Sequence, residues 1–291
     1  MAEHVYHDEG ARPSRYSVSW MVPEVDQVLM GQGLARWLDP YMDGPRAARL
    51  RALTRTIHQK KSEDPALAGL GSMLGAAYEA GFFGGDPVSG HYLALALRGD
   101  TAPRRIPLLV FLHGSAGNFA SYWQVLAPLA RQGKAVVICP TFGFGNWARR
   151  RGGVDHVLAS IRHARRRFPG VGRVYLVGLS NGGTGVTALI NRCGRRGCLP
   201  LAGVAYISGV LSARSIGPSL RRGAWRGLPV LVVHGHRDLR IPHATIRGAV
   251  RALRRGGARI SRLDYRQEDH FLFFAKREQV VARLGRWIAG R

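Results

Sequence analysis

The feature that most constrains the fold is an alternation of short apolar runs with amphipathic stretches, which begins near Gly90 and continues to the C-terminus. Residues 108–112 and 230–233 are continuously apolar, which is typical of strands buried on both faces of a sheet. Strands that alternate with helices build a mainly parallel sheet covered by helices on both sides. The sequence therefore predicts one α/β domain over residues 88–291.

The predicted strands of this domain follow the apolar runs, and the predicted helices follow the amphipathic stretches. The strands span residues 91–97, 107–112, 135–139, 174–179, 203–207, 230–233 and 259–265. The helices span residues 119–131, 154–167, 184–191, 243–255 and 276–289.

Residues 1–87 have a different pattern, with three predicted helices after an irregular start and no catalytic motif. These helices span residues 24–38, 46–59 and 66–80. Asp64 and Pro65 suit the cap and the first position of the third helix. We expect a mostly helical extension that either covers a site on the larger domain or only stabilises that domain.

The chain of 291 residues carries a formal net charge of +25, which invites a nucleic-acid function. However, 39 of the 43 basic residues are arginines scattered through almost every segment rather than gathered in one tail or stripe. Scattered arginines commonly form a solvated surface, with their stems lying over apolar neighbours. We therefore expect no specific nucleic-acid partner, although weak binding to polyanions at low salt follows from the net charge.

The N-terminal residues lack the cationic start and apolar run of a signal peptide, which predicts a cytoplasmic protein. The longest weakly polar stretch, residues 66–83, is interrupted by glycines and Glu79, so no membrane span is expected. Three cysteines are too few for a disulfide framework. Cys193 and Cys198 are interpreted as incidental thiols, although their spacing would also allow a small disulfide loop. The sequence gives no indication of the oligomeric state.

A candidate nucleophile, Ser180, stands at the end of the predicted strand 174–179, between Gly178 and Gly182. The G-x-S-x-G spacing suits a sharp turn from a strand into a helix, because larger side chains would not fit on either side of the serine. Such a turn exposes the serine hydroxyl. The alternative is a glycine-rich turn with a solvated serine.

Nucleophilic serine chemistry requires a base to accept the hydroxyl proton and an acid to orient that base. Asp238 follows the buried run 230–233, and His270 follows the last predicted strand. Both residues therefore stand where parallel strands end at a common edge. Asp264 is a weaker candidate for the acid, because it lies within the same strand that precedes the histidine.

A glycine-rich turn after the strand 107–112 is a candidate oxyanion site. We expect the backbone amide of Ser115, or else that of Ala116, to act together with the amide of Asn181. His113, at the start of the turn, is interpreted as a structural hydrogen-bonding residue rather than a second base.

Taken together, these motifs resemble those of serine hydrolases with the α/β-hydrolase fold, over residues 88–291. The resemblance is carried by residues 113–118, 154–157, 178–183 and 234–242, and by the chain order Ser180, Asp238, His270. Within the superfamily the chain looks most like dienelactone-hydrolase-like and polyester-depolymerase-like esterases and prolyl-oligopeptidase-type peptidases. One departure is that His270 follows Glu268 and Asp269, where a glycine often precedes the histidine of the family.

The resemblance implies a hydrolase that needs no cofactor and acts on a small-molecule ester or amide, with an ester as the first choice. Aromatic residues after two predicted strands, Trp123, Phe142 and Trp147, are expected to line an apolar substrate pocket. His234, His236 and Asp238 also match the start of a metal-binding pattern, but no following histidine extends it, so we expect no metal. A binding protein that kept the fold without the activity is a further alternative.

Overall fold

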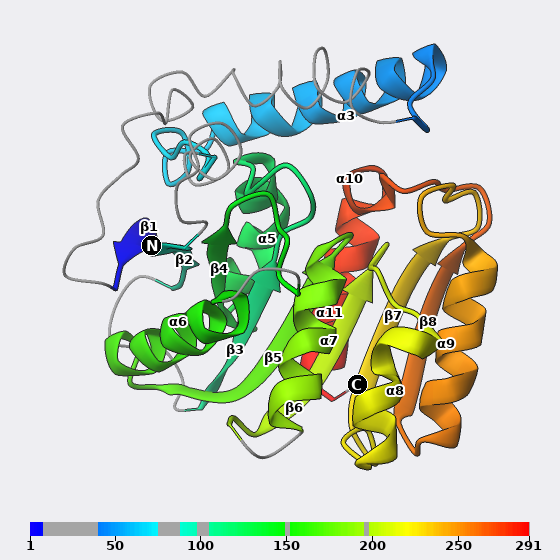
Figure 1. Cartoon of the computed structure of the whole chain (residues 1–291). Coiled ribbons are helices and arrows are strands. Elements are labelled where there is room, and N and C mark those ends of the chain that lie inside the picture. The colour runs from blue at the N-terminus through cyan, green and yellow to red at the C-terminus, as the bar shows by residue number, and fades with distance from the viewer. Residues whose placement is uncertain (8–39, 75–87, 98–104, 149–151, 195–197, 291) are drawn as a thin grey trace.

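The computed structural model describes residues 1–7, 40–74, 88–97, 105–148, 152–194 and 198–290. These residues form an eight-stranded sheet with the order β1-β2-β4-β3-β5-β6-β7-β8 (Figure 1). The strands are β1 (Ala2–Tyr6), β2 (Val88–Leu95), β3 (Ile106–Leu112), β4 (Val136–Phe142), β5 (Val171–Leu179), β6 (Leu201–Ile207), β7 (Pro229–Gly235) and β8 (Arg259–Tyr265). Strands β1 and β2 pair in antiparallel fashion at one edge, and all pairings from β4 to β8 are parallel. The predicted mainly parallel sheet is confirmed.

Helices cover both faces of this sheet. One face carries α6 (Gly153–Arg167), α7 (Gly182–Cys193), α8 (Ala213–Arg221) and α9 (His243–Arg255), and the other carries α5 (Ser121–Arg131), α10 (Leu272–Ala275) and α11 (Arg277–Ile288). Strand β3 shows why the central strands are apolar throughout: Leu108 and Val110 enter one core, whereas Leu109 and Phe111 enter the other. Successive side chains of a strand point to opposite faces, so a strand between two helical layers must be apolar at every position.

Helix α3 (Gly44–Ser62) lies across the carboxyl ends of the strands, at the top of Figure 1. It begins at Asp43, whose side chain accepts a hydrogen bond from the amide of Arg46 and so caps the helix. Leu50 and Ile57 are buried in the core that α5 and α10 share. The predicted helix 46–59 is therefore confirmed with slightly wider bounds, whereas the predicted helix 24–38 lies outside the described residues.

The third predicted helix, 66–80, is wrong in its described part, because residues 66–74 form turns and an isolated bridge. Met73 pairs with Asn118 in that bridge, and the carbonyl of Gly71 accepts a hydrogen bond from the indole of Trp123. Each glycine costs a helix about 1 kcal/mol relative to alanine. Gly69 and Gly71 therefore lower the helix propensity of the segment, so that its tertiary contacts decide its conformation.

The first residues of the chain form an edge strand that the sequence pattern did not predict. Strand β1 pairs with β2 from Ala2 with Leu95 to Tyr6 with His91. Arg167 at the end of α6 also pairs with Glu3, with 2.7 Å between the charged atoms. The division into an extension of residues 1–87 and a domain of residues 88–291 stays a prediction.

Cys193 and Cys198 form a disulfide that closes the loop after α7, with their Cα atoms 5.0 Å apart. The interpretation of these residues as incidental thiols is therefore wrong. Among the described residues the remaining cysteine, Cys139, is buried in β4 and not bonded.

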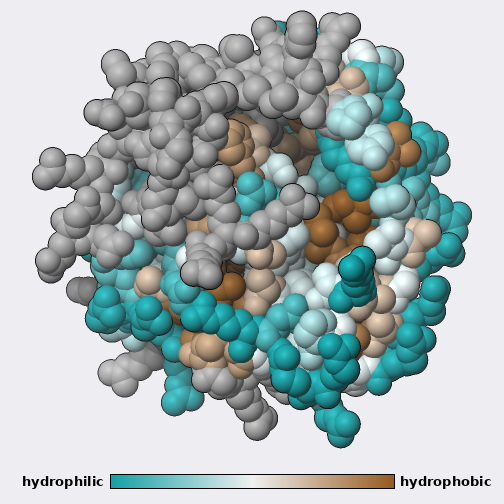
Figure 2. Space-filling view, in the orientation of Figure 1, coloured by the Kyte–Doolittle hydropathy of each residue, from teal (hydrophilic) through white to brown (hydrophobic). Residues whose placement is uncertain are grey.

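Among the coloured residues of the α6–α9 side, hydrophilic ones lie along the lower and right-hand margins, and an apolar patch lies in a hollow near the centre (Figure 2). Within the described ranges, no helix combines the length and the apolar character that crossing a membrane would require.

Candidate active site

Ser180 occupies a strained turn between β5 and α7, which we call the elbow. Its φ angle is +49°, a left-handed conformation that a serine adopts only when its surroundings impose it. A Cβ on Gly178 would lie 2.6 Å from the backbone of Gly182, and a Cβ on Gly182 would lie 2.0 Å from the carbonyl oxygen of Leu112. Both glycines are thus required by the close approach of β3, β5 and α7.

The Ser180 turn is tied to the neighbouring strand by its backbone. Its amide donates to the carbonyl of Ile207 over 3.1 Å, and its carbonyl accepts from the amide of Val210 over 2.8 Å. These bonds hold the turn rigidly at the carboxyl edge of the sheet, where loops of parallel α/β folds bind their ligands.

The structure brings Ser180, His270 and Asp238 into one chain of hydrogen bonds. His270 Nε2 lies 2.9 Å from Ser180 Oγ, and His270 Nδ1 lies 2.8 Å from Asp238 Oδ2. The Asp238 side chain is fully buried, and that of His270 is 12% exposed. The serine comes from the end of β5, whereas the acid and the histidine follow β7 and β8.

Asp238 is held by the loop of residues 236–242, which we call the acid loop. Its second oxygen accepts hydrogen bonds from the amides of Arg240 and Ile241, over 3.0 and 2.9 Å. Asp238 Oδ2 accepts a hydrogen bond from the Nδ1–H group of His270, which leaves Nε2 free to accept the proton of Ser180.

The alternative acid, Asp264, lies elsewhere. It pairs with Arg262 over 2.8 Å on the exposed side of β8. The structure therefore places Asp238, and not Asp264, against His270.

The glycine-rich turn of residues 113–118, which we call the oxyanion turn, lies directly beside the serine. A Cβ on Gly114 would lie 3.1 Å from Ser180 Cβ. Ala116 and Gly117 have φ angles of +73° and +120°, which turn the chain sharply here. Among the described residues, the amides of Ser115 and Asn181 donate to no acceptor. Both are therefore open to a ligand, although the choice between Ser115 and Ala116 stays a prediction.

Two asparagine side chains, whose contacts the sequence patterns did not indicate, hold the backbone beside the oxyanion turn: Asn118 is buried and Asn181 is half-buried. Asn118 Nδ2 donates to the carbonyl of Cys139 and to Thr141 Oγ1, each over 3.1 Å. Asn181 Nδ2 donates to the carbonyl of Gly145 over 2.6 Å. Asn118 thus satisfies a backbone carbonyl of β4, and Asn181 satisfies one of the loop after β4, a pattern that only the folded chain reveals.

His113 is a structural residue, as its place in the turn predicts. Its Nε2 accepts from the amide of Phe142 over 3.1 Å, so Nδ1 carries the proton and donates to the carbonyl of Gly114 over 2.8 Å. Burial lowers the pKa of His113 to about 4. Because both ring nitrogens are engaged and the ring is fully buried, His113 is not a second base.

The three aromatic residues expected to line a substrate pocket are instead packing residues. Trp123 and Phe142 are fully buried, and Trp147 is 1% exposed. Phe142 and Trp147 stack with their ring centres 5.3 Å apart. The expectation was wrong, because these aromatic side chains pack into the two cores that flank the sheet and do not line the site.

Two of the three residues that match the start of a metal-binding pattern, His234 and Asp238, are engaged in other contacts. His234 Nε2 pairs with the carbonyl of Ile241, and Asp238 serves His270. In the part of the chain that the structure describes, one other group could hold a metal ion, namely His236, His243 and Asp264. A terminal nitrogen of Arg262 already lies 2.8 Å from Asp264 and 3.2 Å from His243, so a cationic group occupies that space.

The loop that carries His270 is also held from the N-terminal part of the chain. We call residues 266–271 the histidine loop. In it, Glu268 and Asp269 both pair with Arg49 of α3, the second over 2.9 Å. A small crevice beside His270 is lined by Arg237 and Arg240 of the acid loop and by Tyr41 and Arg46 from the start of α3.

Arg240 closes one side of this crevice. Its guanidinium lies 4.6 Å from the ring centre of Phe271, and burial lowers its pKa to about 10. The stacking of a cation on an aromatic face fixes the side chain next to the histidine loop.

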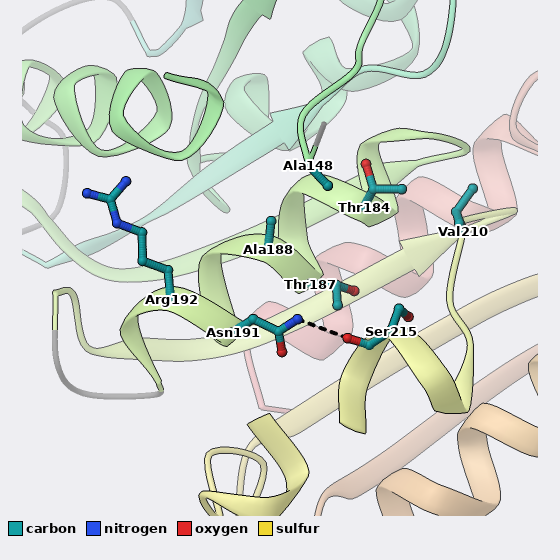
Figure 3. A pocket seen from close by; sticks show the side chains of 8 residues that line it. All are labelled: Ala148, Thr184, Thr187, Ala188, Asn191, Arg192, Val210 and Ser215. Carbon is teal, nitrogen blue, oxygen red and sulfur yellow. Dashed lines mark hydrogen bonds between the residues drawn. The ribbon is translucent and has the colours of Figure 1, made fainter. Parts of the chain in front are cut away.

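A larger groove of about 480 Å³ runs along α7 towards α8 (Figure 3). Its lining includes Thr184, which follows Ser180 closely in sequence, and Val210, whose amide bonds the Ser180 carbonyl. Arg192 lies at the far end of the groove. Asn191 crosses to the carbonyl of Ser215 over 2.9 Å (Figure 3). None of Ser180, Asp238 and His270 lines this groove.

Solved structures of known proteins resemble this fold. TT1662 from Thermus thermophilus matches with a TM-score of 0.53 and 23% sequence identity, over 70% of this chain and 97% of that chain. A hyperthermophilic esterase from Pyrobaculum calidifontis matches with a TM-score of 0.54 and 15% identity, over 69% of this chain and 82% of that one. An acylaminoacyl peptidase from Pyrococcus horikoshii matches with a TM-score of 0.52 and 13% identity, over 67% and 39% of the two chains.

The chain has the α/β-hydrolase fold. At these identities the likeness shows the fold and does not transfer a substrate. Comparison of the sequence with protein-family models and with curated proteins finds no match.

Proposed function

We propose that this protein is a serine hydrolase that cleaves carboxylic esters through an acyl-enzyme intermediate. The observation that carries the proposal is the hydrogen-bonded chain Ser180–His270–Asp238, with distances of 2.9 and 2.8 Å. The neighbouring structures include esterases, which supports the reaction class.

In the first half of the reaction, His270 Nε2 accepts the Ser180 proton while Ser180 Oγ forms a bond to the carbonyl carbon of the ester. The developing oxyanion receives hydrogen bonds from the amides of Asn181 and Ser115. Buried Asp238 stabilises the imidazolium. The carbon–oxygen bond to the alcohol then breaks, and the alcohol leaves with the proton from Nε2.

In the second half, His270 takes a proton from water as the water oxygen attacks the acyl carbon. The tetrahedral intermediate collapses, the carboxylic acid leaves, and the proton returns to Ser180 Oγ. This sequence of proton transfers uses side chains alone, so the proposal includes no cofactor.

Peptide or amide cleavage by the same residues is the second candidate. The acylaminoacyl peptidase among the similar structures favours it, because the same fold serves a peptidase there. The same nucleophile can attack the carbonyl carbon of an ester or of an amide. The preference between the two must therefore be measured.

The test is a panel of 4-nitrophenyl esters and 4-nitroanilides, assayed with the wild type and with Ser180→Ala. Ser261→Ala is a matched control, because Ser261 lies half-buried in β8 away from the elbow. We expect ester hydrolysis that falls about 10⁶-fold in Ser180→Ala and stays unchanged in the control. A correctly folded wild type that hydrolyses neither class would favour a binding protein instead.

The cytoplasmic location expected from the N-terminal sequence stays a prediction. The Cys193–Cys198 disulfide argues against it, because disulfides persist mainly in oxidising compartments.

A further inference from the structure

Two carboxylates directly precede the histidine that would act as the base. The side chains of Glu268 and Asp269 are only 9% and 12% exposed. Buried carboxylates require a counter-ion, because removing a charge from water is costly unless the charge is paired. The partner that both share is Arg49, more than 200 residues earlier in the chain.

The geometry of Arg49 suits this double contact. One terminal nitrogen of its guanidinium lies 2.9 Å from Asp269 Oδ2, and the other contacts Glu268 Oε2. A planar guanidinium presents two donors in fixed directions, whereas a lysine presents one point charge. Burial lowers the pKa of Arg49, but hydrogen bonds and charge from Glu268 and Asp269 outweigh burial and raise it.

The Asp269 carboxylate also fixes the backbone directly after His270. Its Oδ1 accepts from the amide of Phe271 over 2.9 Å, while its Oδ2 binds Arg49. On the other side of the histidine loop, the carbonyl of Glu268 accepts from the amide of Arg237 over 3.0 Å. The histidine loop is thus fastened to the acid loop by its backbone and to α3 by its side chains.

We propose that Arg49 is a positioning residue for His270: it fixes the turn that carries the imidazole and neutralises the two carboxylates beside it. The proposal rests on the proposed function, in which His270 is the base. It gives helix α3 a part in catalysis, beyond covering or stabilising the larger domain.

The charge balance around His270 explains why the loss of Arg49 matters. Lys276 lies 3.5 Å from Glu268 Oε1. The other titratable and charged groups near the histidine loop are Asp238, Arg237 and Arg240 of the acid loop, Arg46 and Arg49 of α3, His234 of β7, Tyr41 and Tyr265. Without Arg49, uncompensated negative charge beside the imidazole favours its protonated form. A protonated His270 does not accept the proton of Ser180.

The test compares Arg49→Gln, Arg49→Lys and Arg55→Gln. Arg55 is a matched control, because it is exposed on the same helix and has no ion pair among the described residues. The first measurement is the pH midpoint for protonation of the His270 imidazole, which is determined by NMR of histidine-labelled protein. The second is the pH profile of kcat/KM with a 4-nitrophenyl ester.

For Arg49→Gln we expect the His270 midpoint to rise by about one pH unit. The reason is that the carboxylates of Glu268 and Asp269, no longer paired with Arg49, attract the protonated imidazole across a partly screened site. The acid limb of kcat/KM should move upward by the same amount. At pH 7, kcat/KM should fall at least ~10-fold, because the base is also less well placed. Arg49→Lys should restore the midpoint but only part of the rate, and Arg55→Gln should match the wild type.

If Arg49→Gln does not fold, the triple variant Arg49→Gln/Glu268→Gln/Asp269→Asn removes the charges together. Its midpoint should lie near that of the wild type. A folded Arg49→Gln with an unchanged His270 midpoint would overturn the proposal, as would an equal shift in Arg55→Gln. A midpoint shift in a protein that hydrolyses no ester would support the role of Arg49 while refuting the ester function.

Discussion

The two halves of the candidate site are built in different ways. The serine half, with the elbow and the oxyanion turn, is fixed by short-range backbone packing around Gly178, Gly182 and Gly114. The histidine half is held by side chains that come together from distant parts of the chain, namely Asp238, Asp269 and Arg49. A site of this kind has a steric half, sensitive to any added atom, and an electrostatic half, sensitive to any lost charge.

Among substitutions that leave the nucleophile in place, the largest expected effect lies in the histidine half. Asp238→Asn should lower kcat/KM by about 10⁴-fold, because the amide no longer stabilises the imidazolium or fixes its tautomer. Asp264→Asn is the matched control, since Asp264 pairs with Arg262 outside the site, and its kcat/KM should stay within about twofold. Equal losses in both variants would show that the acid had been misassigned.

In the serine half, Gly182→Ala should lower both stability and activity, mainly because it disrupts packing. Its new Cβ would lie 2.0 Å from the carbonyl oxygen of Leu112, so β3 and α7 must move apart. We expect a loss of ~3 kcal/mol in unfolding free energy and a ~100-fold lower kcat/KM.

The control for this substitution is Gly248→Ala. A Cβ on Gly248, inside α9, would meet nothing within 4 Å. This variant should gain about 0.5–1 kcal/mol, because alanine favours the helix. Chemical denaturation of both variants checks the pair, and a tolerated Gly182→Ala would contradict the steric account of the elbow.

The last prediction concerns the pH dependence of stability, rather than activity, at the buried His113 under the oxyanion turn. Its pKa is lowered to about 4 by burial, so the folded state favours the neutral ring. This contribution is complete above about pH 6.5 and is lost as the pH falls towards 4, by at most about 3 kcal/mol. Denaturation at pH 7 and pH 4.5 should therefore show a smaller loss of stability in His113→Gln than in the wild type.

His236→Gln, at an exposed position, is the control for that comparison and should lose as much stability as the wild type between the two pH values. An unchanged pH dependence in His113→Gln would show that the ring is hydrated rather than buried. Part of the acid sensitivity should remain, since burial also lowers the pKa of His156 to about 3.

The same contrast explains what could be predicted from the sequence. Ser180 with its two glycines is a local pattern, and the apolar runs before Ser180, Asp238 and His270 fix the sheet edge to which each belongs. Arg49 could not be predicted in the same way, because one arginine among 39 carries no local signal for a partner more than 200 residues away.

Tertiary packing also decided the outcomes that the sequence patterns missed. Trp123 and Trp147 follow strands as pocket residues do, yet both fill the core. Residues 66–74 have an apolar content that suits a helix, but their contacts with Asn118 and Trp123 hold them in turns. Helix α8 lies where the sequence showed no helical pattern, although Ser212 caps it with a capping box.

The most direct test of the account is reaction with a fluorophosphonate probe, followed by mapping of the adduct by mass spectrometry. The account predicts one adduct per chain, on Ser180, which forms in the wild type and in Ser261→Ala and is abolished in Ser180→Ala. The rate of labelling should also fall in Asp238→Asn. Labelling that persists in Ser180→Ala, or an adduct on another residue, would contradict the assignment of Ser180 as the nucleophile.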